Sequence, residues 1–283
     1  MSERPSGDGQ PAAGAAVLTD EQLRAEAVLL DTAERERRQV RQTTGVYPHM
    51  TIDEAYRVQA AWLDIRQARG ERVIGHKIGL TSRAMQQAMS IDPPDSGFLT
   101  DVMVFAPGEP IAVADFCDLR VEVELAFVLD EDLVGADLAI DDVLDATGQV
   151  TAAVELIASR TPRTDPATGR TRGVIDTIAD NAADAGIVTG GWPVEPRDVD
   201  LRWVGAIAYR NGVVEETGLA AGVLDHPANG IVWLARRYAE QNRSLRAGQV
   251  ILSGSFTRPM EVAPGDEFRF DFGPLGAFNL PIV

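Results

Sequence analysis

The stretch "LRVEVELAFVL", residues 119–129, carries the clearest structural signal in this sequence of 283 residues. Charged and apolar residues alternate along it, and the side chains of a β-strand point alternately to its two faces. One face is expected to carry Arg120, Glu122 and Glu124. The other face is strongly apolar and consists of Val121, Val123, Leu125 and Phe127. The pattern therefore predicts a strand near the centre of a sheet.

Outward from this strand, the chain divides into a helical and a β-rich part. Capping boxes at "TDEQ" (19–22) and "TIDE" (51–54) each predict the start of a helix, and Gly70 is expected to end the second. Residues 71–80 predict a strand, and 83–89 a short helix. From about residue 100, short β runs dominate, and "YRNGVV" (209–214) predicts a hairpin turn. The β runs are expected at 101–105, 120–129, 149–158, 201–216, 249–256 and 267–273, with helices at 139–147 and 226–242.

We therefore predict an α+β fold with a disordered leader over residues 1–18. A helical part over 19–100 would include the Lys77 strand and a loop around Asp95, and a β-rich catalytic domain would fill 101–283. Residues 161–173 form a polar, Arg-rich segment that we expect to be a loop and a candidate lid.

Composition excludes several classes of function. The net charge of −17 disfavours nucleic acid and anionic lipid as partners, because both carry negative phosphates. A single cysteine, Cys117, excludes a disulfide framework and a thiolate zinc site, and it fits a reducing compartment. No apolar run approaches the roughly 18 residues of a membrane span, and the first residues lack the pattern of a signal peptide. We expect a cytoplasmic protein without membrane partners.

Lys77 is the only lysine in the sequence, whereas the other 25 basic residues are arginines. Arginine stays charged, whereas a buried lysine can exchange protons. Lys77 lies between Ile74 and Ile78 in an apolar segment, where an unpaired amine is rarely found without a reason. A functional amine is favoured over a leftover surface lysine.

Glu122 and Glu124 would point the same way, roughly 6–7 Å apart along their strand. Two such acids are either solvated on an exposed face or bridged by a cation, and a hard divalent ion suits oxygen ligands. A third acid, Glu155, recurs in the β run "AAVELIASR" (152–160). The sequence has three histidines and no HxxH, CxxC or GxSxG motif, so Mg²⁺ or Mn²⁺ is favoured over zinc. Asp95 in "DPPDSG" has three open interpretations, as a turn residue, a helix cap or a general base.

Five segments together carry a resemblance to a known family. They are "GHKIGLTSRAMQQAM" (75–89), "PDSG" (94–97), "RVEVELAF" (120–127), "DTIADNAADAG" (176–186) and "LSGSFTRP" (252–259). In this order and spacing they resemble the hydratases of meta-cleavage pathways, which belong to the fumarylacetoacetate hydrolase superfamily. The resemblance runs from about residue 47 to the C-terminus.

This resemblance implies a mixed β barrel or roll wrapped by helices, usually in higher homo-oligomers. It implies a Mg²⁺ ion, with Mn²⁺ as an alternative, on Glu122, Glu124 and Glu155. It also implies a catalytic Lys77 and an active-site Asp95, which would move protons with pKa values brought toward neutral. The implied substrate is a small unsaturated 2-oxo diacid that gains water, and association with a pathway decarboxylase is compatible with this role.

The second carboxylate of such a diacid needs a cation. Arg258 lies beside Ser255 in "SGSFTRP" (253–259), and arginine can grip a carboxylate with two parallel hydrogen bonds. The loop from 159 to 172 offers competing arginines, namely Arg160, Arg163, Arg170 and Arg172. His76 is a further candidate for substrate binding, although a packed strand histidine is the simpler interpretation.

Four other functions are alternatives. A related decarboxylase would use the same metal and 2-oxo acid end but release CO₂, and a hydratase acting on 2-keto-4-pentenoate would take a shorter substrate. Hydrolytic C–C cleavage would need a His–Glu pair, and no convincing catalytic histidine is found in the N-terminal half. A non-catalytic partner subunit is disfavoured because Lys77 and the glutamates are all present.

Overall fold

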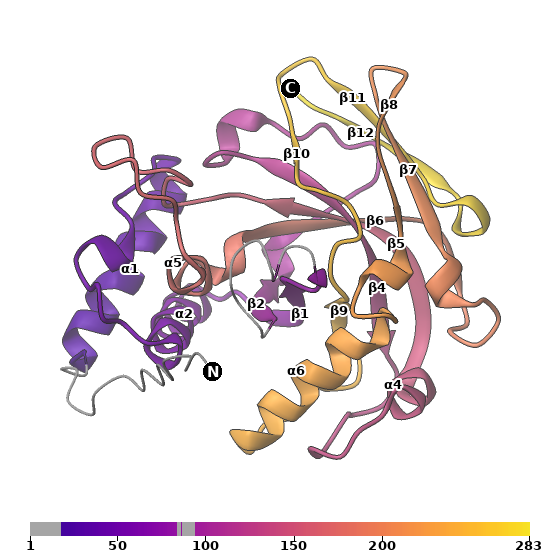
Figure 1. Cartoon of the computed structure of the whole chain (residues 1–283), viewed down its shortest axis with the longest axis horizontal. Coiled ribbons are helices and arrows are strands. Elements are labelled where there is room, and N and C mark those ends of the chain that lie inside the picture. The colour runs from indigo at the N-terminus through magenta and orange to yellow at the C-terminus, as the bar shows by residue number, and fades with distance from the viewer. Residues whose placement is uncertain (1–17, 84–85, 87–93) are drawn as a thin grey trace, which may run out of the picture.

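The computed structural model describes residues 18–83, 86 and 94–283. The larger of its two sheets contains β1 (Val73–Gly79), β2 (Asp95–Thr100), β3 (Val104–Phe105), β4 (Arg120–Leu129), β5 (Thr147–Ile157), β6 (Asp184–Val194), β9 (Val250–Leu252) and β10 (Met260–Glu261). The smaller sheet contains β7 (Gly205–Arg210), β8 (Val213–Leu219), β11 (Glu267–Asp271) and β12 (Ala277–Pro281). The two sheets curl around a shared apolar core, with helices on the outside (Figure 1).

Strand order shows that the fold is mixed. Neighbouring strands of the larger sheet follow the order β2-β1-β9-β4-β5-β6-β3, with β10 also pairing with β4, and the smaller sheet has the order β12-β11-β7-β8. β1 runs parallel to β9, and β3 runs parallel to β6, whereas the other pairs are antiparallel. The predicted mixed β roll with N-terminal helices is confirmed.

β4 is the central strand that its alternating sequence predicts. The side chains of its apolar face are fully buried in the main core, and they are Val121, Val123, Leu125 and Phe127. Burial of one such side chain stabilises the fold by about 1.5–3 kcal/mol. Because a slip of one residue would turn these side chains outward, the register of β4 is strongly specified. The acidic residues of β4 therefore share the opposite face.

Two N-terminal helices, α1 (Asp20–Glu36) and α2 (Ile52–Ala68), begin at the predicted capping boxes. The Glu54 amide donates to Thr51 Oγ1 at 3.2 Å, and the Thr51 amide donates back to the Glu54 carboxylate at 2.8 Å. Leu30 and Trp62 are buried in the small apolar cluster that α1 and α2 share. These helices cover one end of the larger sheet (Figure 1).

Two predicted helices and a predicted hairpin are confirmed in the β-rich part. α4 (Ile140–Ala146) and α6 (Ala228–Glu240) occupy the helical segments expected from the sequence. β7 and β8 form a hairpin whose turn residues, Asn211 and Gly212, have φ angles of 54° and 80°. Both angles are positive, as an Asn-Gly hairpin turn requires.

Some segments differ from the prediction. Asp101–Met103 forms a 3₁₀ turn, so only Val104–Phe105 of the expected β run is a strand. Asp95 begins β2 and does not lie in a loop, because residues 95–100 pair with β1 through backbone hydrogen bonds. A short helix, α5 (Val174–Ala179), follows the 161–173 loop and was not predicted. Most of the expected 83–89 helix and of the 1–18 leader lies outside the described residues.

The larger sheet runs across residue 100, where the sequence suggested a boundary. β1 and β2 precede that residue, yet β1 pairs with β9 near the far end of the chain. Lys77 is thereby brought into the same sheet as the acidic strands. No helix among residues 18–83, 86 and 94–283 is long and apolar enough to cross a membrane.

Candidate active site

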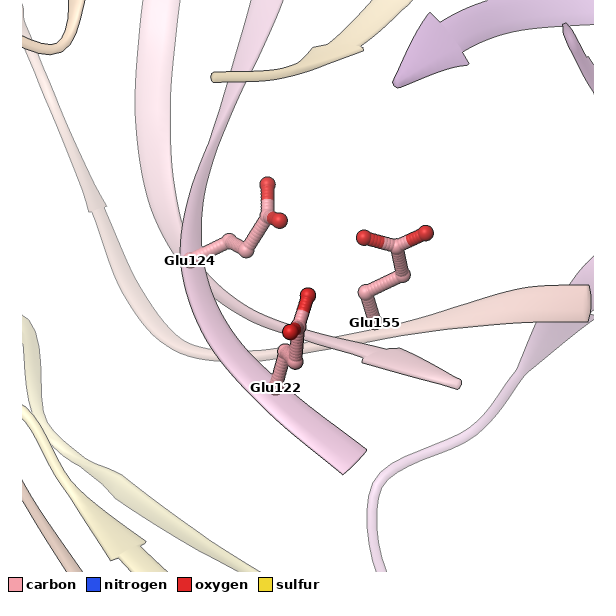
Figure 2. Close-up of side chains that lie close together, drawn as sticks. All are labelled: Glu122, Glu124 and Glu155. Carbon is pink, nitrogen blue, oxygen red and sulfur yellow. The ribbon is translucent and has the colours of Figure 1, made fainter. Parts of the chain in front are cut away.

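Three glutamates from two neighbouring strands converge on one point (Figure 2). Glu122 and Glu124 lie on β4, and Glu155 lies on β5 directly opposite Glu122 in the antiparallel register. One carboxylate oxygen from each residue lies within 4.8 Å of the others. Opposed positions of antiparallel strands bring side chains this close, so sheet register alone gathers the three acids.

The carboxylates are poorly satisfied for groups so deeply buried. Glu155 is fully buried, and Glu124 is 1% exposed. The Gly254 amide donates to Glu124 Oε2 at 2.9 Å, but Glu124 Oε1 and both oxygens of Glu155 accept no hydrogen bond from the residues that the structure describes. Buried charges are normally paired or coordinate a metal. An all-oxygen set of this kind fits a hard divalent cation such as Mg²⁺, Mn²⁺ or Ca²⁺.

Lys77 reaches this cluster from β1. Its Nζ lies 3.1 Å from Glu155 Oε1, in an ion pair that lacks the angles of a hydrogen bond. The lysine is 4% exposed. A Cβ atom at Gly97 of the paired strand β2 would lie 3.2 Å from Lys77 Cγ, so that glycine leaves the space through which the lysine stem passes.

Asp95 lies beside Lys77, opposite Gly79 in the pairing of β1 with β2. It is 1% exposed, and its Oδ1 has no hydrogen-bond partner among the described residues. A Cβ atom at Gly79 would lie only 2.2 Å from this oxygen and 3.1 Å from Lys77 Nζ. Glycine is therefore required at position 79 for the two groups to approach each other.

The electrostatics of the cluster reflect an excess of negative charge. Burial, followed by the charge of Glu155, raises the pKa of Glu122 to about 8 and raises that of Glu124 well above its ordinary value. Burial also raises the pKa of Asp95, although Lys77 opposes this shift. A divalent cation would relieve the repulsion among these carboxylates.

The lysine behaves differently from the expectation. Burial alone would lower the pKa of Lys77, but Glu155, Asp95 and Glu122 together outweigh burial and raise it. The expected shift of the Lys77 pKa toward neutral is therefore wrong for these protein groups alone, because a fourth acid, Asp184, also raises the pKa of this amine. These acids favour the charged form of Lys77.

Two cavities meet at the glutamate cluster. The smaller, of about 280 Å³, is lined by Lys77, Asp95 and Glu122 together with residues of the 161–173 loop. The larger, of about 470 Å³, also touches Glu122 and extends toward Ser255 and Arg258. Because both cavities share Glu122, a small molecule bound at the cluster has two directions in which to extend.

Comparison with known proteins assigns the chain to a family. A model described as the C-terminal region of fumarylacetoacetate (FAA) hydrolase matches residues 73–283. The chain belongs to the fumarylacetoacetate hydrolase family. The matched region contains the three glutamates, Lys77 and Asp95, whereas α1 and α2 precede it.

Relatives within the fumarylacetoacetate hydrolase family include two hydratases. The 2-oxo-hept-4-ene-1,7-dioate hydratase of Escherichia coli is 50% identical over 254 residues, which cover 90% of this chain and 95% of that protein. The 2-keto-4-pentenoate hydratase of Paraburkholderia xenovorans is 38% identical, covering 82% and 84% of the two chains. Among solved structures, 4-oxalocrotonate decarboxylase from Pseudomonas putida G7, complexed with magnesium and adipate, has a TM-score of 0.89 and 32% identity over 94% of this chain and 99% of that one.

Ser255 and Arg258 lie on the wall of the larger cavity, as part of the segment that follows β9. Ser255 Oγ donates to the Thr257 carbonyl at 2.9 Å. The Arg258 side chain is 79% exposed and pairs with Glu216 of β8 at 2.6 Å. Arg258 is thus near the site, but its charge already has a partner and is well solvated.

The structure does not bring Arg160 and His76 to these cavities. Arg160 is 1% exposed, and its Nε donates to Asp180 Oδ1 at 2.6 Å. His76 precedes Lys77 on β1 and therefore points to the opposite face of the strand. There its Nδ1 lies 3.0 Å from the Tyr238 hydroxyl, and burial, helped by Arg243, lowers the His76 pKa to about 3.

Sequence reasoning missed Asp184, a further buried acid in this member of the fumarylacetoacetate hydrolase family. It begins β6, and burial, with the charge of Glu155, raises its pKa well above its ordinary value. In the segment "NAADAG" (181–186), small residues flank this acid, and no second acid stands at strand spacing from it. Its acid is recognisable only after β5 and β6 are paired, because that pairing carries Asp184 to the cluster.

The turn before Asp184 is strained, and it lines the smaller cavity. Asn181, Ala182 and Ala183 have φ angles of 51°, 51° and 63°, a left-handed conformation that costs roughly 1–2 kcal/mol for each such residue. The Asn181 side chain holds the turn against β2, because it accepts from the Phe98 amide at 2.8 Å and donates to the Phe98 carbonyl at 3.0 Å. Ala182 and Ala183 both lie on the cavity wall. Strain of this kind concentrates at functional sites.

Proposed function

We propose that this chain is a metal-dependent hydratase of meta-cleavage aromatic catabolism, in the homoprotocatechuate route. It would add water to 2-oxo-hept-4-ene-1,7-dioate, formed from 2-hydroxy-hepta-2,4-diene-1,7-dioate, to give 4-hydroxy-2-oxoheptanedioate. The observation that carries this proposal is the cluster of three glutamates, of which Glu124 and Glu155 are buried, with Lys77 and Asp95 beside a small cavity. It occurs in a chain 50% identical to a hydratase named for this substrate.

Glu122, Glu124 and Glu155 would hold the metal, for which we propose Mg²⁺, with Mn²⁺ as an alternative. The unsatisfied oxygens of Glu124 and Glu155 support this assignment, as does the magnesium in the structure of the related decarboxylase. A divalent ion supplies a Lewis acid for the 2-oxo acid end of a substrate.

Lys77 and Asp95 would move the protons of the reaction. The 2-oxo-hept-4-ene form loses a proton from C3 to give the dienol. The dienol then loses its hydroxyl proton and gains a proton at C5, which leaves a C3–C4 double bond conjugated with the 2-oxo group. Water then adds its oxygen at C4, and a proton is delivered to C3. Lys77 is positioned as an ammonium donor, and Asp95 offers an unpartnered oxygen beside it. Positioned acid–base groups typically contribute about 10²–10⁴-fold to the rate.

A decarboxylase of the 4-oxalocrotonate type is the second candidate. Its support is the TM-score of 0.89 over nearly the whole chain. Both reactions begin from a 2-oxo acid beside a divalent metal, so the cluster alone favours neither. The 50% identity to the hydratase named for this substrate, against 34% and 36% for two 4-oxalocrotonate decarboxylases, favours hydration.

The deciding experiment is the mass of the product. The enzyme would be incubated with 2-hydroxy-hepta-2,4-diene-1,7-dioate and Mg²⁺, with and without a chelator. A gain of one water that the chelator abolishes supports the proposal. A loss of CO₂ would assign the chain to the decarboxylases, and no reaction except with 2-hydroxypenta-2,4-dienoate would assign it to the shorter-chain hydratases.

We further propose a homo-oligomer that can associate with a pathway decarboxylase. Trp192 and Trp203 are 69% and 72% exposed, and large apolar side chains in contact with water are typical of surfaces that bind other chains. Light scattering of the protein, alone and mixed with such a decarboxylase, tests both statements. A monodisperse monomer in both samples would contradict them.

A further inference from the structure

Two arginines share the smaller cavity with the glutamate cluster. Arg163 and Arg172 come from the loop between β5 and α5, and they line the same 280 Å³ space as Lys77, Asp95 and Glu122. Small-molecule sites usually have volumes of about 300–1,000 Å³, so this cavity suits a compact metabolite. Its wall thus combines an acidic, metal-binding region with two cations.

Arg172 is a buried cation with too little negative charge around it. It is 9% exposed, and its Nη1 donates to Ser159 Oγ and lies 3.3 Å from Asp180 Oδ2. Asp180 is already engaged by Arg160 at 2.6 Å, so a single carboxylate serves two guanidinium groups. Burial lowers the pKa of Arg172, and the charge of Asp180 does not fully restore it.

Arg163 contributes an unused donor. Its Nε donates to Asp118 Oδ2 at 2.6 Å, which orients the guanidinium group. Its Nη2 is buried and has no acceptor within the described parts of the chain. A buried donor without an acceptor is unfavourable, so a ligand that supplies an acceptor gains affinity.

We propose that Arg163 and Arg172 bind the C7 carboxylate of the diacid while its 2-oxo acid end lies at the glutamates. This inference rests on the proposed function and names the residues that select a diacid over a monoacid. Arg258 is the weaker candidate, because it lies on the other cavity and its exposed guanidinium is already paired with Glu216.

The test compares two substrates in the full-length, Mg²⁺-loaded enzyme. We would measure kcat/KM for 2-hydroxy-hepta-2,4-diene-1,7-dioate and for 2-hydroxypenta-2,4-dienoate, which lacks the second carboxylate. Arg163→Gln should lower the diacid-to-monoacid ratio by about 10- to 100-fold, as expected for the loss of a charge-assisted hydrogen bond. The main effect should fall on KM for the diacid. Arg163→Lys should recover part of the diacid-to-monoacid ratio, because lysine keeps the positive charge but lacks the forked N–H donors of a guanidinium group.

Arg170→Gln is the matched control. Arg170 lies in the same loop, but it donates to Gln42 and does not line the cavity. Its variant should keep the wild-type ratio. Arg172→Gln should lower the ratio as Arg163→Gln does. Because Arg172 also pairs with the buried Asp180, circular dichroism would confirm that this variant is folded.

Binding gives an independent measurement. Competitive inhibition by adipate should weaken about 10-fold or more in Arg163→Gln, while inhibition by pentanoate should change little. An unchanged substrate ratio in Arg163→Gln, or equal losses for both substrates, would overturn the inference. So would a loss of diacid preference in Arg258→Gln instead. If the wild type hydrated neither substrate, the proposed function itself would fail, which is a distinct result.

Discussion

Gly79→Ala is the sharpest test of how Asp95 and Lys77 are arranged. Position 79 is the end of β1, and its backbone partner is Asp95 on β2. The backbone at Gly79 does not have a positive φ angle, so alanine introduces no conformational strain there. The only effect of the substitution is the methyl group itself.

The structure indicates the size of the effect. The new Cβ would lie 2.2 Å from Asp95 Oδ1, whereas an ordinary contact begins at 3.4 Å. The Asp95 carboxylate must therefore retreat by roughly 1 Å, and a misplacement of about 1 Å can reduce a rate 10²-fold. Overpacking of this kind typically destabilises a protein by about 1–3 kcal/mol. We expect both effects, with metal binding by the glutamates retained.

The assay is kcat for the diacid together with the free energy of unfolding in urea. Gly205→Ala is the matched control, because a Cβ in that strand, β7, would make only an ordinary 3.5 Å contact with the Gly218 carbonyl oxygen. In an Asp95→Ala background, Gly79→Ala should lose most of its effect on stability, because the clashing oxygen is gone. Wild-type kcat in Gly79→Ala, or an equal destabilisation in both backgrounds, would refute the reasoning.

Three other predictions concern the cluster and His76. Lys77→Met should reduce kcat at least about 10²-fold. Lys77→Arg should be similarly inactive, because arginine retains the charge but does not exchange a proton. Wild-type turnover in either variant would contradict the role of the amine. At a Mg²⁺ concentration about 100 times Kd, calorimetry should show the wild type stabilised by about 2.7 kcal/mol over chelated protein, and Glu155→Gln should lose most of this gain. His76 is neutral in the fold, because its pKa is lowered to about 3 from 6.5, so the unfolded chain binds the extra proton below pH 6.5. The wild type should lose up to about 1.4 kcal/mol per pH unit relative to His76→Gln as the pH falls from 6.5 toward 3, and parallel urea-unfolding curves would count against this.

Local sequence rules predicted the elements whose reasons are local. The capping boxes at Thr19 and Thr51 need only neighbours three residues away. The Asn-Gly turn depends on the φ angles of two residues. The alternation in β4 by itself predicts which side chains lie on each face of the strand, because burial of only one face fixes the register. Lys77 and the three glutamates were singled out by residue type and spacing in the same way.

Other features could not be read from the sequence, because their causes lie far along the chain. The strand that begins at Asp95 exists because it pairs with β1, and α5 packs against the distant helix α2. Arg160 and Arg163 have the same side chain in the same loop. Arg160 is paired with Asp180, whereas Arg163 lines the cavity and keeps one buried donor without an acceptor among the described residues. Only their surroundings separate them.

Sequence alone determined the chemistry that is present: a single lysine, an E-x-E strand that buries its opposite face, and a third glutamate in a second strand. Tertiary structure decided which groups meet. It brought β1 beside β9 and β4 beside β5, so that Lys77 lies 3.1 Å from Glu155, and it turned His76 away. The physical reason is that residue type and local periodicity are properties of neighbours in the chain, whereas burial and charge pairing depend on strands that are separate in the sequence, such as β1 with Lys77 and β5 with Glu155.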